Sequence, residues 1–187
     1  MKTTKKGFTL IELIVVIAII GVLAAILVPA MLGYVRKSKV SSANSAANSL
    51  QKAINTALVE IDEETEEASG INSISYTAGQ ATVTLAADLT VNNVTISGDK
   101  TYTKIQNYMD KVHKLNFFAK CNGGVCTGVA CRQKGAKYTG TSPSGVCTVD
   151  NVDSMSSAEL SSLAALAEAK NAKGGSNATT AAAPQGD

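Results

Sequence analysis

The sequence of 187 residues predicts an α+β protein: a long N-terminal α-helix packed against a small antiparallel β-sheet, with an extra helix near the C-terminus. First, an apolar run from Leu13 to Met31 passes into apolar residues spaced three and four apart, which is typical of an amphipathic helix. Second, short alternating or β-branched segments with intervening turn residues follow Gly70, as in a β-meander. Third, helical spacing returns between Ser156 and Lys170.

A short basic leader precedes the apolar run. Residues 1–7 contain three lysines, and the segment from Phe8 to Ala30 has Glu12 as its one charged side chain. The stretch is longer than the roughly 7–15 apolar residues of a secretory signal, and it meets the roughly 20 that a membrane-spanning helix needs. A carboxylate in lipid costs roughly 2.5–3.5 kcal/mol on insertion scales, so Glu12 is expected to have a functional partner. The leader lysines predict a cytoplasmic N-terminus.

The residues Gly7-Phe8-Thr9-Leu10-Ile11-Glu12 resemble the class III signal of the type IV pilins. As a motif, the resemblance covers residues 2 to about 35. It implies cleavage between Gly7 and Phe8 by a prepilin peptidase, N-methylation of Phe8, and pairing of Glu12 with the α-amine of Phe8 in a neighbouring subunit. It also implies a ladle-shaped fold, residence in the inner membrane before assembly, and incorporation by the pilus assembly machinery into a homopolymeric pilus on the cell surface.

Three residues, Gly21, Pro29 and Gly33, are expected to break the long helix. Proline cannot donate to the carbonyl four residues earlier and crowds it, so a kink or local weakening is expected there. One interpretation is an ordinary kinked membrane helix. The other, implied by the resemblance, is a segment that bends or loses helical structure within a filament. If continuous from Phe8 to Glu66, the helix is about 90 Å long.

The chain is expected to comprise five segments. They are the leader 1–7, the transmembrane and assembly half of the helix 8–33, its amphipathic half 34–69, a β-rich head 70–173 with two disulfides, and a tail 174–187. The tail has almost no core-forming residues, so disorder is expected. The acidic run at the end of the helix is interpreted either as a solvated end or as a binding surface.

Turn signals and periodicity place the elements of the head. Strands are expected at 71–77, 81–85, 91–96, 116–119, 125–132 and 146–149, with helices at 101–114 and 156–170. The turn between the strands at 116–119 and 125–132 is expected at Asn122-Gly123-Gly124. Ser156 and Glu159 have the spacing of a capping box at the start of the last helix.

Four cysteines lie in the last third of the chain, at Cys121, Cys126, Cys131 and Cys147. Their even number and exported position favour two disulfides over a zinc site, and the spacing lacks the C-x2-C pairs of common zinc knuckles. The predicted pairs are Cys121–Cys126, which would cross-link the two strands across the turn between them, and Cys131–Cys147. The two other connectivities stay open.

Charge and motif content argue against a nucleic-acid binder and against an enzyme. Removal of the leader lysines leaves 14 basic residues (17 − 3) and 15 acidic ones, without the strong basic excess of a general nucleic-acid binder. The one histidine, His113, lies close to Lys111 and Lys114 in the sequence. No Ser, Asp or Cys has the spacing of a catalytic motif that would supply a nucleophile for it. There is no phosphate loop or dinucleotide fingerprint, so neither catalytic residues nor a cofactor or metal is predicted.

The favoured function is a structural subunit of a type IV pilus that serves adhesion, motility or DNA uptake. The alternatives are a pseudopilin of a type II secretion or competence system and a membrane-tethered binding module. Abundance in sheared surface filaments separates the first from the second, and ligand binding by the soluble domain alone would favour the third.

Overall fold

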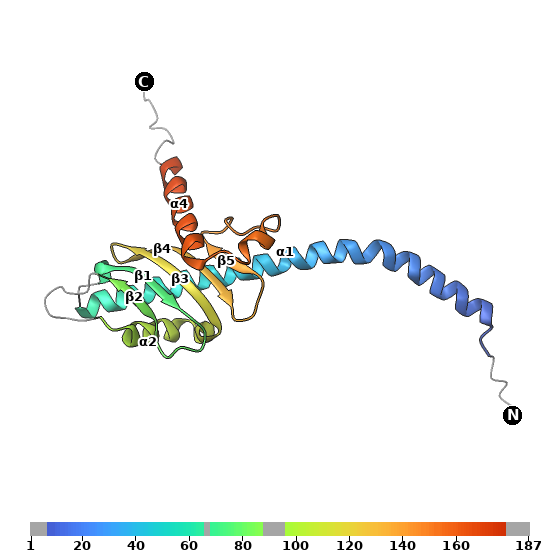
Figure 1. Cartoon of the computed structure of the whole chain (residues 1–187), viewed down its shortest axis with the longest axis horizontal. Helices are drawn as coiled ribbons and strands as arrows, with labels where there is room; N and C mark the ends of the chain where they lie inside the picture. Colours follow the sequence, from blue (N-terminus) through green and yellow to red (C-terminus); the bar gives the residue numbers. More distant parts are fainter. Residues whose placement is uncertain (1–6, 66–67, 88–95, 179–187) are drawn as a thin grey trace, which may run out of the picture. The chain divides into compact units, whose positions relative to one another are not determined.

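A computed structural model describes residues 7–65, 68–87 and 96–178. The chain forms two compact units, residues 1–38 and 39–187, and helix α1 (Leu10–Thr65) contributes to both (Figure 1). Several expected features lie outside the described residues: leader residues 1–6, Glu66 and Glu67 at the expected helix end, nearly all of the strand at 91–96, and tail residues 179–187.

The first unit contains the N-terminal part of α1. Every described side chain from Gly7 to Ser38 is exposed, although most of them are apolar. Among the described residues, α1 is the one helix long and apolar enough to cross a membrane. It is assigned as one continuous helix through Gly21, Pro29 and Gly33, and the expected kink or weakening there stays a prediction. Pro29 removes one hydrogen bond of a long ladder, which the rest of the helix tolerates; loss of helix within a filament stays a prediction.

The second unit is built around a five-stranded antiparallel sheet with the order β2-β1-β3-β4-β5. Its strands are β1 (Ile71–Tyr76), β2 (Thr84–Ala87), β3 (Leu115–Asn122), β4 (Val125–Gln133) and β5 (Thr139–Ser142). Its other helices are η1 (Ala68–Gly70), α2 (Gly98–Tyr108), η2 (Asp110–Lys114), α3 (Val152–Met155) and α4 (Leu160–Ala178). The α+β class, with a long first helix and an extra C-terminal helix, is confirmed.

The sheet separates two apolar clusters, because alternate residues of a strand point to opposite faces. On one face, Phe117 and Val129 pack against the apolar stripe of α1. The buried members of that stripe are Val40, Ala47, Leu50, Ala53, Ile54, Ala57, Leu58 and Ile61. On the other face, Ala130 packs against Leu163 and Ala164 of α4. The sheet therefore lies between α1 and α4 as the middle of three layers (Figure 1).

The strand expected at 146–149 is wrong, and β5 forms the edge of the sheet instead. The side chain of Asn151 holds residues 146–148 as a loop, since its Oδ1 accepts from the Thr148 N–H at 2.8 Å and its Nδ2 donates to the Val146 carbonyl at 2.7 Å. These bonds replace those of a strand ladder. The strand expected at 81–85 is also displaced, to β2 at Thr84–Ala87.

Both helices expected in the head differ from their predicted bounds. The one at 101–114 is divided at Met109, whose φ of −145° and ψ of 85° lie outside the helical region and separate α2 from η2. The last helix begins at Leu160 rather than Ser156 and continues to Ala178 rather than Lys170. Ser156 forms no capping box, because it ends α3 and its hydroxyl donates to the Asp153 carbonyl at 2.8 Å.

Three amide side chains of α1 bind the backbone of the last two strands. Oδ1 of Asn44 accepts from the Thr141 N–H of β5 at 3.0 Å. Farther along α1, Nε2 of Gln51 donates to the Cys126 carbonyl at 2.9 Å, and Oδ1 of Asn55 accepts from the Cys126 N–H at 2.7 Å. Because β5 pairs only with residues 129–132 of β4, the bonds from Gln51 and Asn55 satisfy backbone groups of β4 where β5 is absent.

Candidate functional site: the N-terminal assembly segment

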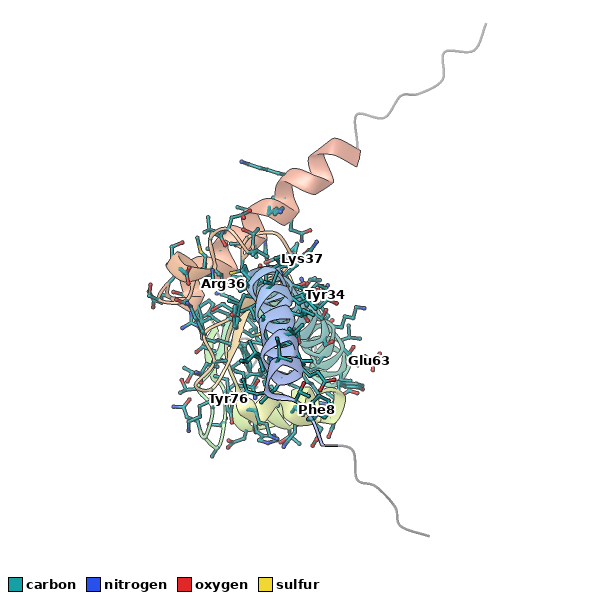
Figure 2. All side chains as sticks on the ribbon, turned by 90° about the vertical axis from the view of Figure 1, so that its right-hand side faces the viewer. Phe8, Tyr34, Arg36, Lys37, Glu63 and Tyr76 are labelled. Atoms are coloured by element: carbon teal, nitrogen blue, oxygen red, sulfur yellow. The ribbon has the colours of Figure 1, made fainter. Side chains whose placement is uncertain are left out.

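The described chain reaches α1 through Phe8, which Figure 2 labels, and Thr9, whose hydrogen bonds cap the helix. The carboxylate of Glu12 accepts from the Thr9 backbone N–H at 2.9 Å and from its hydroxyl at 2.7 Å. The backbone N–H of Glu12 in turn donates to the Thr9 hydroxyl at 3.3 Å. This reciprocal arrangement is a capping box, with Thr9 as N-cap and Glu12 three residues later. In the isolated chain, Glu12 is thus satisfied by its own helix start.

Sequence analysis missed the part played by Thr9. The signal is present in the sequence, because Thr9 and Glu12 have the T-x-x-E spacing of a capping box. The structure therefore shows a local use for Glu12 that competes with the expected partner in a second subunit. Any test of Glu12 must separate helix capping from intersubunit pairing.

The surface around Glu12 is apolar. Phe8, which is 82% exposed, lines a shallow depression with Ile11, Glu12, Val15 and Val16. Glu12 contributes the one charged side chain of this described surface, and every neighbour in the depression is a large apolar residue. Such an apolar surface is stable only when lipid or another protein covers it.

Comparison with known proteins identifies this segment. A family described as the prokaryotic N-terminal methylation motif matches residues 2–28. The N-terminal segment of the chain is therefore similar to that of type IV fimbrial proteins. Among its relatives is the type IV major fimbrial protein FimA of Dichelobacter nodosus, 48% identical over 60 residues, which are 32% of this chain and 38% of FimA. Most of the matched residues lie in α1, which is long and apolar enough to cross a membrane.

Two further fimbrial relatives match over a similar length. The fimbrial protein of Moraxella nonliquefaciens is 54% identical over 52 residues, covering 28% of this chain and 34% of the relative. The fimbrial protein EcpC of Eikenella corrodens is 52% identical over 54 residues, covering 29% of this chain and 35% of the relative. The chain thus spans little more than a third of the length of these pilin relatives. No solved structure matches it significantly.

All four cysteines are buried and present as free thiols, so the structure does not contain the two expected disulfides. Cys121 and Cys126 nevertheless lie directly opposite each other in β3 and β4. The pKa of the Cys126 thiol is raised, first by its hydrogen bond with Cys121 and then by burial. Burial raises the pKa of Cys131 to about 12 and also raises that of Cys147.

The remaining candidate groups are not gathered into a second site. Within residues 7–65, 68–87 and 96–178, no three His, Cys, Asp or Glu side chains are placed to hold a metal ion. His113 is exposed on η2, with Nδ1 2.9 Å from the Asp110 carbonyl oxygen. Part of the acidic run holds α2 against α1, because Nζ of Lys104 lies 2.7 Å from Glu64 and 3.2 Å from Glu60. The bond to Glu64 is the main cause that raises the pKa of Lys104.

Proposed function

We propose that this chain is a structural subunit of a type IV pilus. The observation that carries the proposal is the pilin segment of α1, which is apolar and exposed on every side and contains Glu12 as its single charge. Burying each large apolar side chain contributes about 1.5–3 kcal/mol, so lipid before assembly and other subunits afterwards would stabilise this helix. The head, with its own core and no gathered catalytic groups among the described residues, is the part that the filament displays.

The steps of the proposal follow the N-terminal motif. A prepilin peptidase cuts between Gly7 and Phe8, and Phe8 receives an N-methyl group. The subunit then leaves the inner membrane through the pilus assembly machinery and joins a homopolymer outside the cell. Gly21, Pro29 and Gly33 are the places where α1 would bend or unwind within the filament.

Shearing of cells and identification of the filament protein test the function itself. The chain is expected to be the major polypeptide of the sheared fraction. Absence from that fraction, with the protein retained in the envelope, would favour a pseudopilin. If the head alone binds a defined ligand and cells form no filament from the chain, a membrane-tethered binding module would be favoured.

We expect the mature protein to begin at N-methylated Phe8. Glycine at position 7 leaves room in a peptidase site that a side chain would obstruct, so Gly7→Val should abolish cleavage. Mass spectrometry of the N-terminal peptide measures both the cleavage position and the methylation of Phe8. The matched control is Gly21→Val, which is distant from the cleavage site. A mature terminus other than Phe8 would contradict this processing.

We expect the exported protein to contain Cys121–Cys126 and Cys131–Cys147 disulfides. The backbone N–H and C=O of Cys126 bind Asn55 and Gln51 of α1, so they point away from β3. Cys121 and Cys126 are Cα partners beside an irregularity in the β3–β4 pairing. Directly opposed residues of antiparallel strands have Cα atoms about 4.5–5.5 Å apart, which lies within the range of disulfides. In the Cys131→Ser/Cys147→Ser variant, the non-reduced mass should lack two hydrogen atoms relative to the reduced chain. Two free thiols in that variant would refute the first pair.

A further inference from the structure

Positive charge gathers at one end of the head. Lys39 begins the head part of α1, η2 carries Lys111 and Lys114, and the β4–β5 loop carries Lys134 and Lys137. These five lysines, all exposed, are called the basic end. Two contacts bring the segments together: Leu115, which follows η2, pairs with Gln133 in the sheet, and the Lys134 N–H donates to the Lys114 carbonyl at 3.0 Å.

A cleft of about 360 Å³ lies within the basic end. Lys39 and Ser42 of α1 line it on one side, and Lys137 and Tyr138 line it on the other. Leu115 and Cys131, both buried, contribute apolar surface. None of the ten lining residues is acidic. Cationic and hydroxyl groups beside an apolar surface form a site that suits an anionic headgroup with attached hydrocarbon.

The carboxylates near the basic end only partly offset its charge. Asp153 lies 2.5 Å from Nζ of Lys137, and Asp110 begins η2. The opposite end of the head part of α1 is acidic, with Glu60, Asp62, Glu63 and Glu64. The head therefore has two electrically distinct ends along α1.

Chain continuity limits what the basic end can reach. Tyr34, Arg36 and Lys37 follow the apolar run, and Tyr34 is 74% exposed (Figure 2). Tyrosine is enriched at both membrane–water interfaces, and Arg or Lys side chains near the end of a membrane helix extend their charged groups to the interface. Lys39 follows Gly33 by six residues, a length of chain that spans at most about 20 Å. In a membrane-anchored chain, Lys39, the first residue of the head unit, therefore stays within that distance of the end of the apolar run.

We propose that the basic end of the head binds anionic phospholipid headgroups while the subunit resides in the membrane, and that the cleft between Lys39 and Lys137 receives one headgroup. This inference rests on the membrane-anchored stage of the proposed function. An anionic surface attracts nearby lysines over a distance comparable to the Debye length, which is about 10 Å in 0.1 M salt. Headgroup contact would hold the head at the bilayer until assembly withdraws the subunit.

The test uses the full chain in phosphatidylglycerol-containing vesicles and in pure phosphatidylcholine vesicles. A membrane-impermeant acylating reagent is added, and peptide mass spectrometry measures modification of each lysine relative to Lys52, an exposed residue in the middle of α1. We expect several-fold slower acylation of the five basic-end lysines in the anionic vesicles only. High salt should remove this protection, because the attraction is electrostatic.

Charge reversal supplies a matched pair of variants. Lys111→Glu/Lys114→Glu should restore acylation of Lys39, Lys134 and Lys137 in anionic vesicles. Lys170→Glu/Lys173→Glu, with the same charge change and spacing on α4, should leave their protection intact. Equal acylation of the basic end in both lipids would overturn the inference, and so would an equal effect of the two variants.

Two other outcomes distinguish headgroup binding from contact with a second copy of the chain and from a failure of membrane anchoring. Protection that appears in phosphatidylcholine and rises with protein density would assign the basic end to the acidic end of a second copy, and would overturn lipid binding. Flotation of the vesicles reports anchoring independently. A chain that floats without basic-end protection refutes headgroup binding alone, whereas a chain that does not float refutes the anchored stage as well.

Discussion

Glu12→Ala is expected to leave membrane insertion and leader cleavage intact while removing most surface filaments. In the assembled bundle, the carboxylate would face the α-amine of Phe8 in a neighbouring subunit. A subunit docked out of register would leave Glu12 unpaired in apolar surroundings, which is costly, so the pair selects the correct register. Filaments are measured as pilin in the sheared fraction, and insertion and cleavage as mature protein in the membrane fraction.

The capping box makes a sharper experiment available. Glutamine also serves at the third position of a capping box, so Glu12→Gln keeps the helix start and removes the charge. Thr9→Ala does the reverse: it removes the N-cap hydroxyl, which costs about 0.5–2 kcal/mol, and leaves the carboxylate. We expect Glu12→Gln to assemble as poorly as Glu12→Ala, and Thr9→Ala to assemble far better than either. Normal piliation of Glu12→Gln would show that pairing does not set the register.

Gly140→Ala is expected to cause a large loss of head stability. The Cβ of an alanine at this position in β5 would overlap the carbonyl oxygen of Ala43 and crowd the backbone N of Asn44. Both neighbours are backbone atoms of α1, so relief requires helix and strand to separate. Overpacking of this kind typically costs about 1–3 kcal/mol, and we expect the upper end of that range. The measurement is thermal unfolding of the full chain in detergent, followed by circular dichroism.

A glycine of the neighbouring loop provides the control. Gly135 has a φ of +75°, and a Cβ added there would meet no described atom within 4 Å. Asparagine tolerates this left-handed backbone better than other residues with a side chain. Gly135→Asn should therefore shift the melting temperature much less than Gly140→Ala. Equal shifts for the two variants would mean that the contact with Ala43 does not limit the packing of β5.

Elements that depend on short-range patterns could be predicted from the sequence. The apolar residues of α1 at steps of three and four became the buried stripe, because one face of a helix repeats at that spacing. The β3–β4 turn follows from Gly123 and Gly124, whose φ values of +57° and +78° are readily adopted by glycine. The pilin-like motif from Gly7 to Glu12 could be recognised in the sequence for the same reason, because its residues are consecutive.

The candidate site was predictable only in part. Phe8 and Glu12 lie within the matched N-terminal motif, and their roles in processing and assembly stay predictions. The capping of α1 by Thr9 was not predicted. The basic end could not be anticipated, because its five lysines come from α1, η2 and the β4–β5 loop and only folding brings these segments together.

The sequence by itself determined the N-terminal segment, the amphipathic face of α1 and the α+β class, because each depends on residues within a few positions of one another. Tertiary structure decided the edge of the sheet: β5 formed at 139–142, and 146–149 stayed a loop. The physical reason is that backbone groups there find partners far away in the chain. Asn44 bonds to Thr141 and to the Cys147 carbonyl, at separations of 97 and 103 residues. Hydrogen bonds over such separations leave no periodic trace in the local sequence, so only the folded chain shows which segment becomes the strand.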